Sequence, residues 1–319
     1  MDTAIPEPGP DGLVWKLDFP SRDGGAGWQW RHYDLVNRQA RNAIEADAAL
    51  PEFARAILVG SDDSVRVVSD DDVVAGVVPS YARSGDADAF EITFWHFAMT
   101  PRILVTGRKT ATRTLVAMWD AIQRGRAPAS PTAAINMGIT EFAREARVRL
   151  AQLSDYLDPV EDQLIEWHGD VVVSELSGRI GAARREASRL KRVAVPLMRA
   201  LEEDAEELPS WTHVDRTDTG QRLLGSNLDD IAALADRAHS LQDEVDTRLG
   251  EETNRRLYLV SVITTLVLPA TFVTGYFGMN TGGLPWSGDG APYGSIYATI
   301  ICAAAIILTL LGLRWKRLL

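Results

Sequence analysis

Cysteine and basic charge are both scarce in this sequence, and each shortage excludes a class of protein. The chain of 319 residues has one cysteine, Cys302, so a disulfide framework is excluded. Lys and Arg number 33 against 44 Asp and Glu, which gives a formal net charge of -11 at pH 7. An acidic chain is a poor partner for nucleic acid, so we expect no nucleic-acid binding.

Motifs for catalysis and for cofactor binding are lacking as well. We find no phosphate-binding loop, no nucleophile elbow and no paired metal-ligand motif, so we expect neither an enzyme nor a bound cofactor. The N-terminal residues show no basic segment followed by an apolar one, and we expect no cleaved signal peptide. The histidines include no HxxxH-type pair, and we interpret each as a packing or surface residue: His32, His96, His168, His213 and His239.

Two long apolar runs lie near the C-terminus. Residues 257–277 contain no ionisable group except tyrosines, and residues 295–313 are equally free of charge. A helix of about 20 residues crosses the roughly 30 Å of hydrocarbon in a bilayer. Because neither run has a polar face, a pair of buried helices in a soluble core is disfavoured. The sequence therefore predicts a transmembrane hairpin.

Basic residues flank this hairpin on its outer sides only. Arg255 and Arg256 precede the first run, and Arg314, Lys316 and Arg317 follow the second. The connecting residues 278–294 include no Lys or Arg. The positive-inside rule then places both termini in the cytoplasm, in a multi-pass protein of the inner (plasma) membrane.

The first part of the chain alternates short apolar runs with turn residues. Strands are predicted at 13–18, 28–35, 56–60, 64–68, 73–79, 90–98 and 102–106, and a helix at 37–49. Residues 124–131 contain Gly, Pro and Ser and are the expected hinge into a helical remainder. The expected fold class is an α+β cytoplasmic domain followed by long helices and a C-terminal two-helix transmembrane hairpin.

The remainder before the membrane is predicted to be helical. Residues 132–207 lack strand signals and predict two or three helices, broken near Gly169 and again at Pro196. From about Thr219 one uninterrupted helix is expected, because apolar residues recur every three or four positions: Leu224, Leu228, Ile231, Ala235, Ala238, Leu241, Val245 and Leu249. We divide the chain into a cytoplasmic α/β domain (1–130), a cytoplasmic helical segment (131–218), the stalk part of the long helix (219–256), the first span (257–277), an external loop (278–294), the second span (295–313) and a basic cytoplasmic tail (314–319).

A short motif ends the first apolar run. Residues 276–280 are Tyr-Phe-Gly-Met-Asn, and Pro269 and Thr271 lie two turns earlier. This motif, within a C-terminal hairpin that follows a long cytoplasmic domain, resembles the CorA family of divalent-cation transporters. The continuation Thr-Gly-Gly-Leu-Pro-Trp at 281–286 is similar to the zinc-transporter branch of that family. An acidic Met-Pro-Glu-Leu type of loop is usual in the magnesium branch.

The resemblance implies a function and an assembly. It implies a funnel-shaped homopentamer in the lipid bilayer whose first spans line a pore for Zn²⁺, with Mg²⁺, Co²⁺ or Ni²⁺ as the alternative cargo. It also implies polar rings at Thr271 and Asn280, and it matches Leu257, Val260 and Leu268 to apolar gate positions. The alternative from another class is a membrane-anchored sensor or scaffold, but an anchor has no need of a polar turn between its spans.

The first span offers neutral oxygens in place of charged ligands. It contains no Asp, Glu or His, so an ion is expected to travel at least partly hydrated. Hydroxyl and amide oxygens suit hydrated ions, although a hydroxyl can instead bond to its own helix: Ser261, Thr264, Thr271, Thr274 and Asn280. The predicted pore lining is Leu257, Val260, Ser261, Thr264, Leu268, Thr271 and Gly275. The predicted entrance filter is Gly278, Met279, Asn280 and Asp289.

Carboxylates cluster once in the cytoplasmic part. The cluster consists of Glu202, Glu203, Asp204, Glu206 and Glu207. Like charges without a nearby His or Cys are interpreted as a solvated helix end. A weak divalent-cation site is the alternative.

Overall fold

The computed structural model describes residues 5–20, 27–83, 90–167, 173–202, 208–213, 215, 217–279 and 293–315. The chain forms two compact units. The first comprises residues 1–167 and 174–242, and the second comprises residues 168–173 and 243–319. One helix, α6 (Thr219–Phe277), contributes residues to both units.

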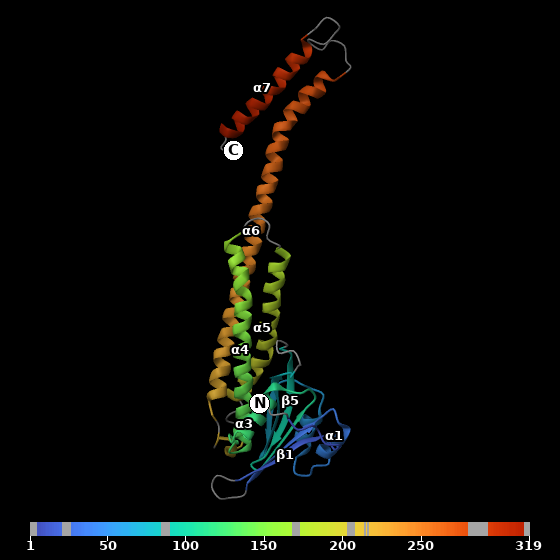
Figure 1. Ribbon diagram of the computed structural model, residues 1–319, viewed down its shortest axis with the longest axis vertical. Helices are drawn as coiled ribbons and strands as arrows, with labels where there is room; N and C mark the ends of the chain where they lie inside the picture. Colours follow the sequence, from blue (N-terminus) through green and yellow to red (C-terminus); the bar gives the residue numbers. More distant parts are fainter. Residues whose placement is uncertain are drawn as a thin grey trace. The chain divides into compact units, whose positions relative to one another are not determined.

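A six-stranded sheet forms the N-terminal part of the first unit (Figure 1). The strands are β1 (Leu13–Phe19), β2 (Trp28–Asp34), β3 (Arg66–Asp70), β4 (Val73–Tyr81), β5 (Ile92–Met99) and β6 (Ile103–Arg108). Their spatial order is β1-β2-β6-β5-β4-β3, and only the β2 and β6 pair is parallel. The mostly antiparallel sheet with its helices confirms the predicted α+β class.

Helices cover both faces of this sheet. Helices α1 (Arg38–Glu45) and α2 (Glu52–Val59) lie on one face, where Ile44 and Leu58 join a core that includes Val77 and Val105 of the sheet. Helices α3 (Arg113–Gln123) and α4 (Pro131–Ile165) pack against β4. Gly138 of α4 allows close contact there, because an added Cβ would lie 2.8 Å from the Trp95 ring.

The predicted strand at 56–60 is wrong, since these residues lie in α2 and just after it. Ala54, Ile57 and Leu58 are buried at a helical spacing, which places them on one face toward the sheet. The local run Ala-Ile-Leu-Val is equally compatible with a strand. The decisive signal is the spacing of apolar residues by three and four positions after Pro51, at Ala54, Ile57 and Leu58.

Three long helices complete the first unit. They are α4, α5 (Val173–Glu202) and the N-terminal part of α6, side by side in Figure 1. Arg149 pairs with Glu186, and Arg179 lies over the Tyr156 ring, so α4 and α5 are antiparallel. Helix α4 ends at Ile165 and α5 begins at Val173, and the predicted interruption at Gly169 lies outside the described residues. The predicted break at Pro196 is wrong because α5 continues through it. A proline removes one backbone hydrogen bond, and packing of the α5 face outweighs that loss.

Helices α4 and α6 run parallel and in a fixed register. Asn227 Nδ2 donates to the Ala143 carbonyl at 2.8 Å, and Arg237 donates to the Ser154 carbonyl at 3.2 Å. The two contacts join residues that are 84 and 83 positions apart in the sequence, as expected for parallel helices in one register. The register follows from the buried face of α6, whose members in the first unit alternate by three and four positions: Leu224, Asn227, Ile231, Leu234, Ala238 and Leu241.

This buried face differs in part from the predicted stripe. Leu228 and Ala235 are only half-buried, and Leu249 is 41% exposed. Asn227 and Leu234 take buried positions that the prediction omitted. The buried asparagine was missed because a stripe defined by apolar residues passes over a polar one.

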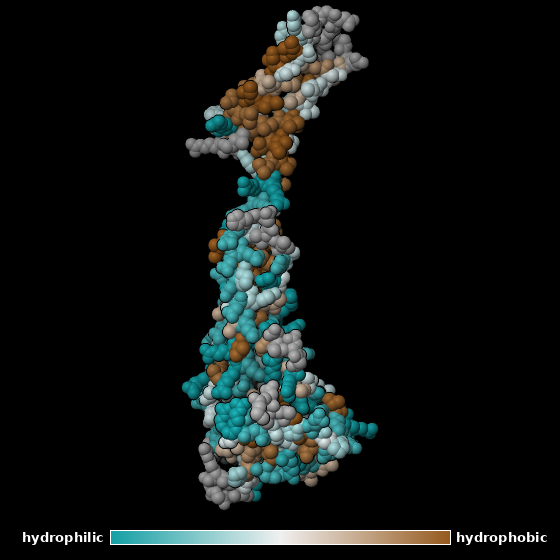
Figure 2. Space-filling view, in the orientation of Figure 1, coloured by the Kyte–Doolittle hydropathy of each residue, from teal (hydrophilic) through white to brown (hydrophobic). Residues whose placement is uncertain are grey.

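The second unit contains the C-terminal part of α6 and helix α7 (Gly294–Trp315). Both helices are long and apolar enough to cross a membrane, and their apolar windows are not buried within the chain. Figure 2 shows apolar residues gathered over these helical segments, whereas polar residues dominate the visible surface of the first unit. Apolar surface of this kind requires a bilayer or other protein around it.

Candidate ion pathway and polar clusters of the first unit

The C-terminal part of α6 has one side that faces α7. The half-buried residues on that side are Val262, Leu266, Pro269, Ala270, Val273 and Phe277. The matching half-buried residues of α7 include Ala298, Cys302, Ala305, Thr309 and Leu313. Cys302 Sγ lies 3.8 Å from the Ala270 carbonyl oxygen, which marks the contact between the two helices. Cys302 therefore takes part in helix packing.

The predicted pore residues lie on the other side of α6. Leu257 and Val260 are each 61% exposed, Leu268 is 65% exposed, and Ser261, Thr264, Thr271 and Gly275 are exposed as well. At about 100° per residue, the centre of this group lies roughly 180° around the helix from the side that faces α7. Helix α6 thus brings all seven predicted residues to one face, opposite its contact with α7. Asn280 and Asp289 lie outside the described residues.

The hydroxyls on this part of α6 donate to their own helix. Ser261 donates to the Leu257 carbonyl at 2.9 Å, and Thr264 donates to the Val260 carbonyl at 2.7 Å. Thr271 and Thr274 do the same, toward the carbonyls of residues 267 and 271. A hydroxyl that donates a hydrogen bond still has oxygen lone pairs that can accept hydrogen bonds. The intrahelical bond therefore leaves these side chains as acceptors, which suits the water around a cation.

Two further features lie in the C-terminal half of α6. Pro269 has no N–H group, so the Thr265 carbonyl lacks its usual donor four residues on. Helix α6 ends at Phe277, where the Gly278 N–H donates to the Thr274 carbonyl at 2.9 Å. The remaining carbonyls of the last turn form the negative end of the helix dipole, which attracts cations.

The acidic cluster that follows α5 is only partly described. Glu202 is the last residue of α5 and is exposed, whereas Glu203, Asp204, Glu206 and Glu207 lie outside the described residues. In the described part of the chain, no three His, Cys, Asp or Glu residues are arranged to hold a metal ion. The weak-site interpretation of Glu202 and its neighbours gains no support from these residues.

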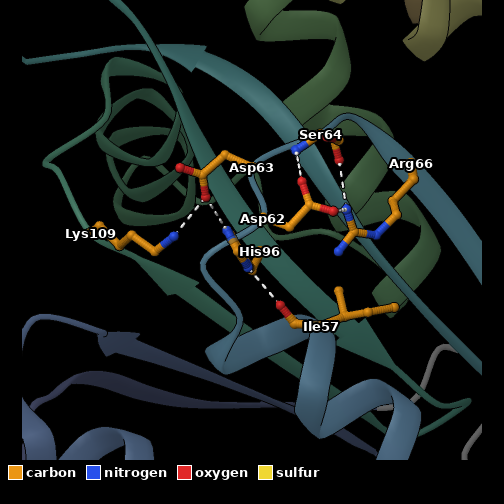
Figure 3. A network of polar contacts seen from close by, with 7 residues as sticks. All are labelled: Ile57, Asp62, Asp63, Ser64, Arg66, His96 and Lys109. Carbon is orange, nitrogen blue, oxygen red and sulfur yellow. Dashed lines mark hydrogen bonds and ion pairs between the residues drawn. The ribbon is translucent and has the colours of Figure 1, made fainter.

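His96 holds the loop that follows α2 against the sheet (Figure 3). Its Nδ1 lies 2.7 Å from the Ile57 carbonyl oxygen, and its Nε2 lies 3.0 Å from Asp63 Oδ1. His96 therefore bridges the Ile57 carbonyl and the Asp63 carboxylate. Lys109 Nζ contacts the same Asp63 oxygen at 2.7 Å. Burial acts to raise the pKa of Asp63, but hydrogen bonds from Lys109 and His96 lower it overall.

His32 is buried in a second polar cluster. Its Nε2 accepts from Arg108 Nε at 3.2 Å, and its Nδ1 lies 2.8 Å from Thr106 Oγ1. Burial, assisted by the Arg108 charge, lowers the pKa of His32 well below its ordinary value. His32 is therefore neutral, and its contacts give it a structural role.

Glu145 of α4 is a half-buried acid that the sequence analysis did not single out. Burial first, and then the charge of Glu141, raises its pKa to about 7, although Arg113 opposes the shift. Its Oε2 atom is buried and has no hydrogen-bond partner in the described part of the chain. The available signal was its place between Phe142 and Ala146 on the buried side of α4.

Replacing Glu145 with Gln should stabilise the protein at pH 8 and have little effect at pH 4. Below pH 4.5 the carboxyl is protonated in both states, but between pH 4.5 and about 7 it ionises only in the unfolded chain, which lowers stability. The expected gain at pH 8 is on the order of 2 kcal/mol. The measurement is the melting temperature of the purified protein and of Glu145→Gln at both pH values. An equal shift at both would contradict the assigned ionisation.

The fold and the two apolar helices indicate the class of protein: a membrane protein with an α+β domain, a helical bundle and a two-helix apolar hairpin. The chain belongs to the CorA-like Mg²⁺ transporter protein family, whose family model matches residues 25–317. It is accordingly a CorA-like transporter of divalent cations, and this family is one of transporters and not of enzymes.

Relatives and solved structures agree with this membership. The zinc transport protein ZntB of Yersinia pseudotuberculosis (serotype O:1b, strain IP 31758) is 23% identical over 296 residues, which cover 90% of this chain and 86% of the relative. ZntB of Cronobacter sakazakii is 25% identical over 289 residues, with 90% and 85% covered. The full-length CmaX structure has a TM-score of 0.72 at 20% identity, with 97% of this chain and 98% of that chain covered. The CorA magnesium transporter from Methanocaldococcus jannaschii has a TM-score of 0.71 at 15% identity, with 90% of each chain covered.

Proposed function

We propose that this protein conducts divalent cations through a central pore formed by several copies of α6, with zinc as its main cargo. The observation that carries the proposal is the placement of the seven predicted pore residues opposite the α7 contact. If α7 occupies one side of α6, the other side is available to face an axis shared between copies. The neutral acceptors on that side would then form rings around the axis.

Exposed apolar surface supports the proposal of self-assembly. Leu257, Val260 and Leu268 are mostly exposed in the single chain, beside hydroxyls that favour a polar partner. A homopentamer would enclose this mixed face around water and leave the more apolar α7 toward lipid. We propose the pentamer as the working assembly, and the earlier division into cytoplasmic domain, stalk, spans, loop and tail as its organisation.

The cargo is argued from chemistry and from the relatives. The relatives named ZntB favour zinc, whereas the family description and the CorA relative favour magnesium as the second candidate. Zinc that is bound directly prefers His or Cys ligands, and residues 257–277 include neither. We therefore propose passage of a hydrated ion, with Gly278, Met279, Asn280 and Asp289 as the entrance filter.

Uptake into proteoliposomes tests the proposal. Zn²⁺, Mg²⁺, Co²⁺ and Ni²⁺ are supplied in separate experiments, with and without a pH gradient, and native mass measurement reports the copy number in detergent. We expect protein-dependent Zn²⁺ uptake by an oligomer. A monomer without uptake of any of the four ions would favour the sensor or scaffold instead.

The proposed topology places both termini in the cytoplasm, because basic residues flank only the outer ends of the hairpin. A cysteine introduced as Ser287→Cys in the loop should then react with an impermeant thiol reagent from outside intact cells. Labelling is measured before and after lysis, with Cys302→Ser as the background. Labelling only after lysis would reverse the assigned orientation.

A further inference from the structure

A cavity of about 420 Å³ opens between the sheet and helices α4 and α5 in the first unit. This volume falls within the range of about 300–1,000 Å³ that is typical of small-molecule sites. Apolar walls come from Ile92 and Phe94 of β5, Leu153 of α4, and Leu190 and Val193 of α5. Two further aromatic residues and five charged residues, three of them arginines, complete the lining: Tyr81, Phe90, Glu91, Glu186, Arg149, Arg189 and Arg192.

Arg149 is the arginine that the fold holds in place. Its Nη2 atom lies 2.7 Å from Glu186 Oε2, and its guanidinium lies 4.5 Å from the centroid of the Phe90 ring. Its side chain is 21% exposed. The Glu186 carboxylate balances the Arg149 charge, so this pair forms a rigid wall of the cavity.

Arg189 and Arg192 supply charge that is not balanced in this way. They lie three residues apart on α5, which places them on the same side of the helix at the cavity. Among the described residues neither forms an ion pair or a hydrogen bond, and both are exposed. Other basic residues of α5, such as Arg184 and Lys191, do not line the cavity.

We propose that this cavity binds an organic phosphate, with the phosphate on Arg189 and Arg192 and the organic part against Leu153, Leu190 and Val193. This site is separate from the ion pathway and goes beyond the proposed transport function. Planar guanidinium groups present parallel N–H donors that match phosphate oxygens. Two such groups on one helix side fit a dianion better than a single carboxylate.

The apolar walls distinguish an organic phosphate from inorganic phosphate. A bare ion would gain only from the arginines, whereas an attached carbon skeleton also removes apolar wall surface from water. A nucleotide and a sugar phosphate share the same head group. The base of the nucleotide is more apolar than the sugar of the sugar phosphate. The difference in their affinities therefore measures the contribution of the apolar walls.

The experiment is titration calorimetry on the full-length protein in detergent, in buffer depleted of divalent cations by a chelating resin. The ligands are ATP, AMP, glucose 6-phosphate and inorganic phosphate. The test variant is Arg189→Ala with Arg192→Ala, and the charge-matched control is Arg184→Ala with Lys191→Ala on the same helix. Circular dichroism checks that both remain helical.

We expect ATP or AMP to bind more tightly than inorganic phosphate. The test variant should weaken this binding by about tenfold or more, because hydrogen bonds to charged groups are lost, while the control stays within about twofold. Three results would overturn the proposal: no organic phosphate binds, inorganic phosphate binds equally well, or both double variants weaken binding alike. Because no ion moves in this assay, its outcome is independent of transport.

Discussion

Gly275→Leu should reduce cation flux by about tenfold or more while the single chain still folds. Gly275 lies on the α6 face opposite α7, and an added Cβ there meets no atom within 4 Å in the chain. Leucine is a better helix former than glycine by roughly 0.8–1 kcal/mol, so α6 itself should not be weakened. In the proposed pentamer, however, five leucine side chains would crowd the axis. Uptake into proteoliposomes measures the effect.

Gly312→Leu is the matched control. Gly312 lies in α7, and an added Cβ there likewise meets no atom within 4 Å. The two variants add the same side chain to a glycine in an apolar helix, but only Gly275 is on the proposed pore face. Wild-type uptake by an intact Gly275→Leu oligomer, or equal loss in both variants, would contradict the proposed pore face.

Asn280→Ala should lower flux by about tenfold or more and leave the assembly intact. The proposed ring of amide oxygens would accept hydrogen bonds from the water around an approaching ion, and alanine removes these acceptors. Helix α6 ends at Phe277, with the Gly278 N–H bonded within the last turn, so we expect the helix to end there in the variant as well. Initial rates of Zn²⁺ and Mg²⁺ uptake are the measurement.

Asn280→Asp separates charge from hydrogen bonding at the same position. An added carboxylate should bind a divalent cation more tightly and slow its release, because conduction requires a site that the ion can leave. Thr309→Ala is the control, since Thr309 lies on the half-buried side of α7. If Asn280→Ala transports both ions at the wild-type rate as an intact oligomer, the turn is structural and the filter assignment is wrong.

The sequence predicts elements well where one period extends over many residues. The long apolar runs and the three-and-four spacing before them predict α6 and α7, because a sustained pattern excludes other structures. The short helix α2 was predicted as a strand, since four apolar residues fit either structure. A break was predicted at Pro196, but α5 continues through it because packing along the helix outweighs one lost hydrogen bond.

The polar residues of the interior were the least predictable part. Asn227 is buried and Glu145 is half-buried by neighbours that are distant in sequence, and apolar spacing alone does not mark a polar residue as part of that interior. The cavity arginines have the same difficulty, because a row of basic residues on α5 predicts only a solvated face. The grouping of the seven residues on one face of α6 was more accessible to prediction, since it follows from helical spacing within one element. That this face lines a pore stays a prediction.

The side chains of residues 257–277 limit how a pH gradient can influence transport. Residues 257–277 contain no Asp, Glu, His or Lys, and the described hydroxyls have placed their hydrogen atoms on backbone carbonyls. Such a stretch has no carboxylate or imidazole to take up and release protons near neutral pH. A pH gradient would therefore act on flux through groups elsewhere in the chain.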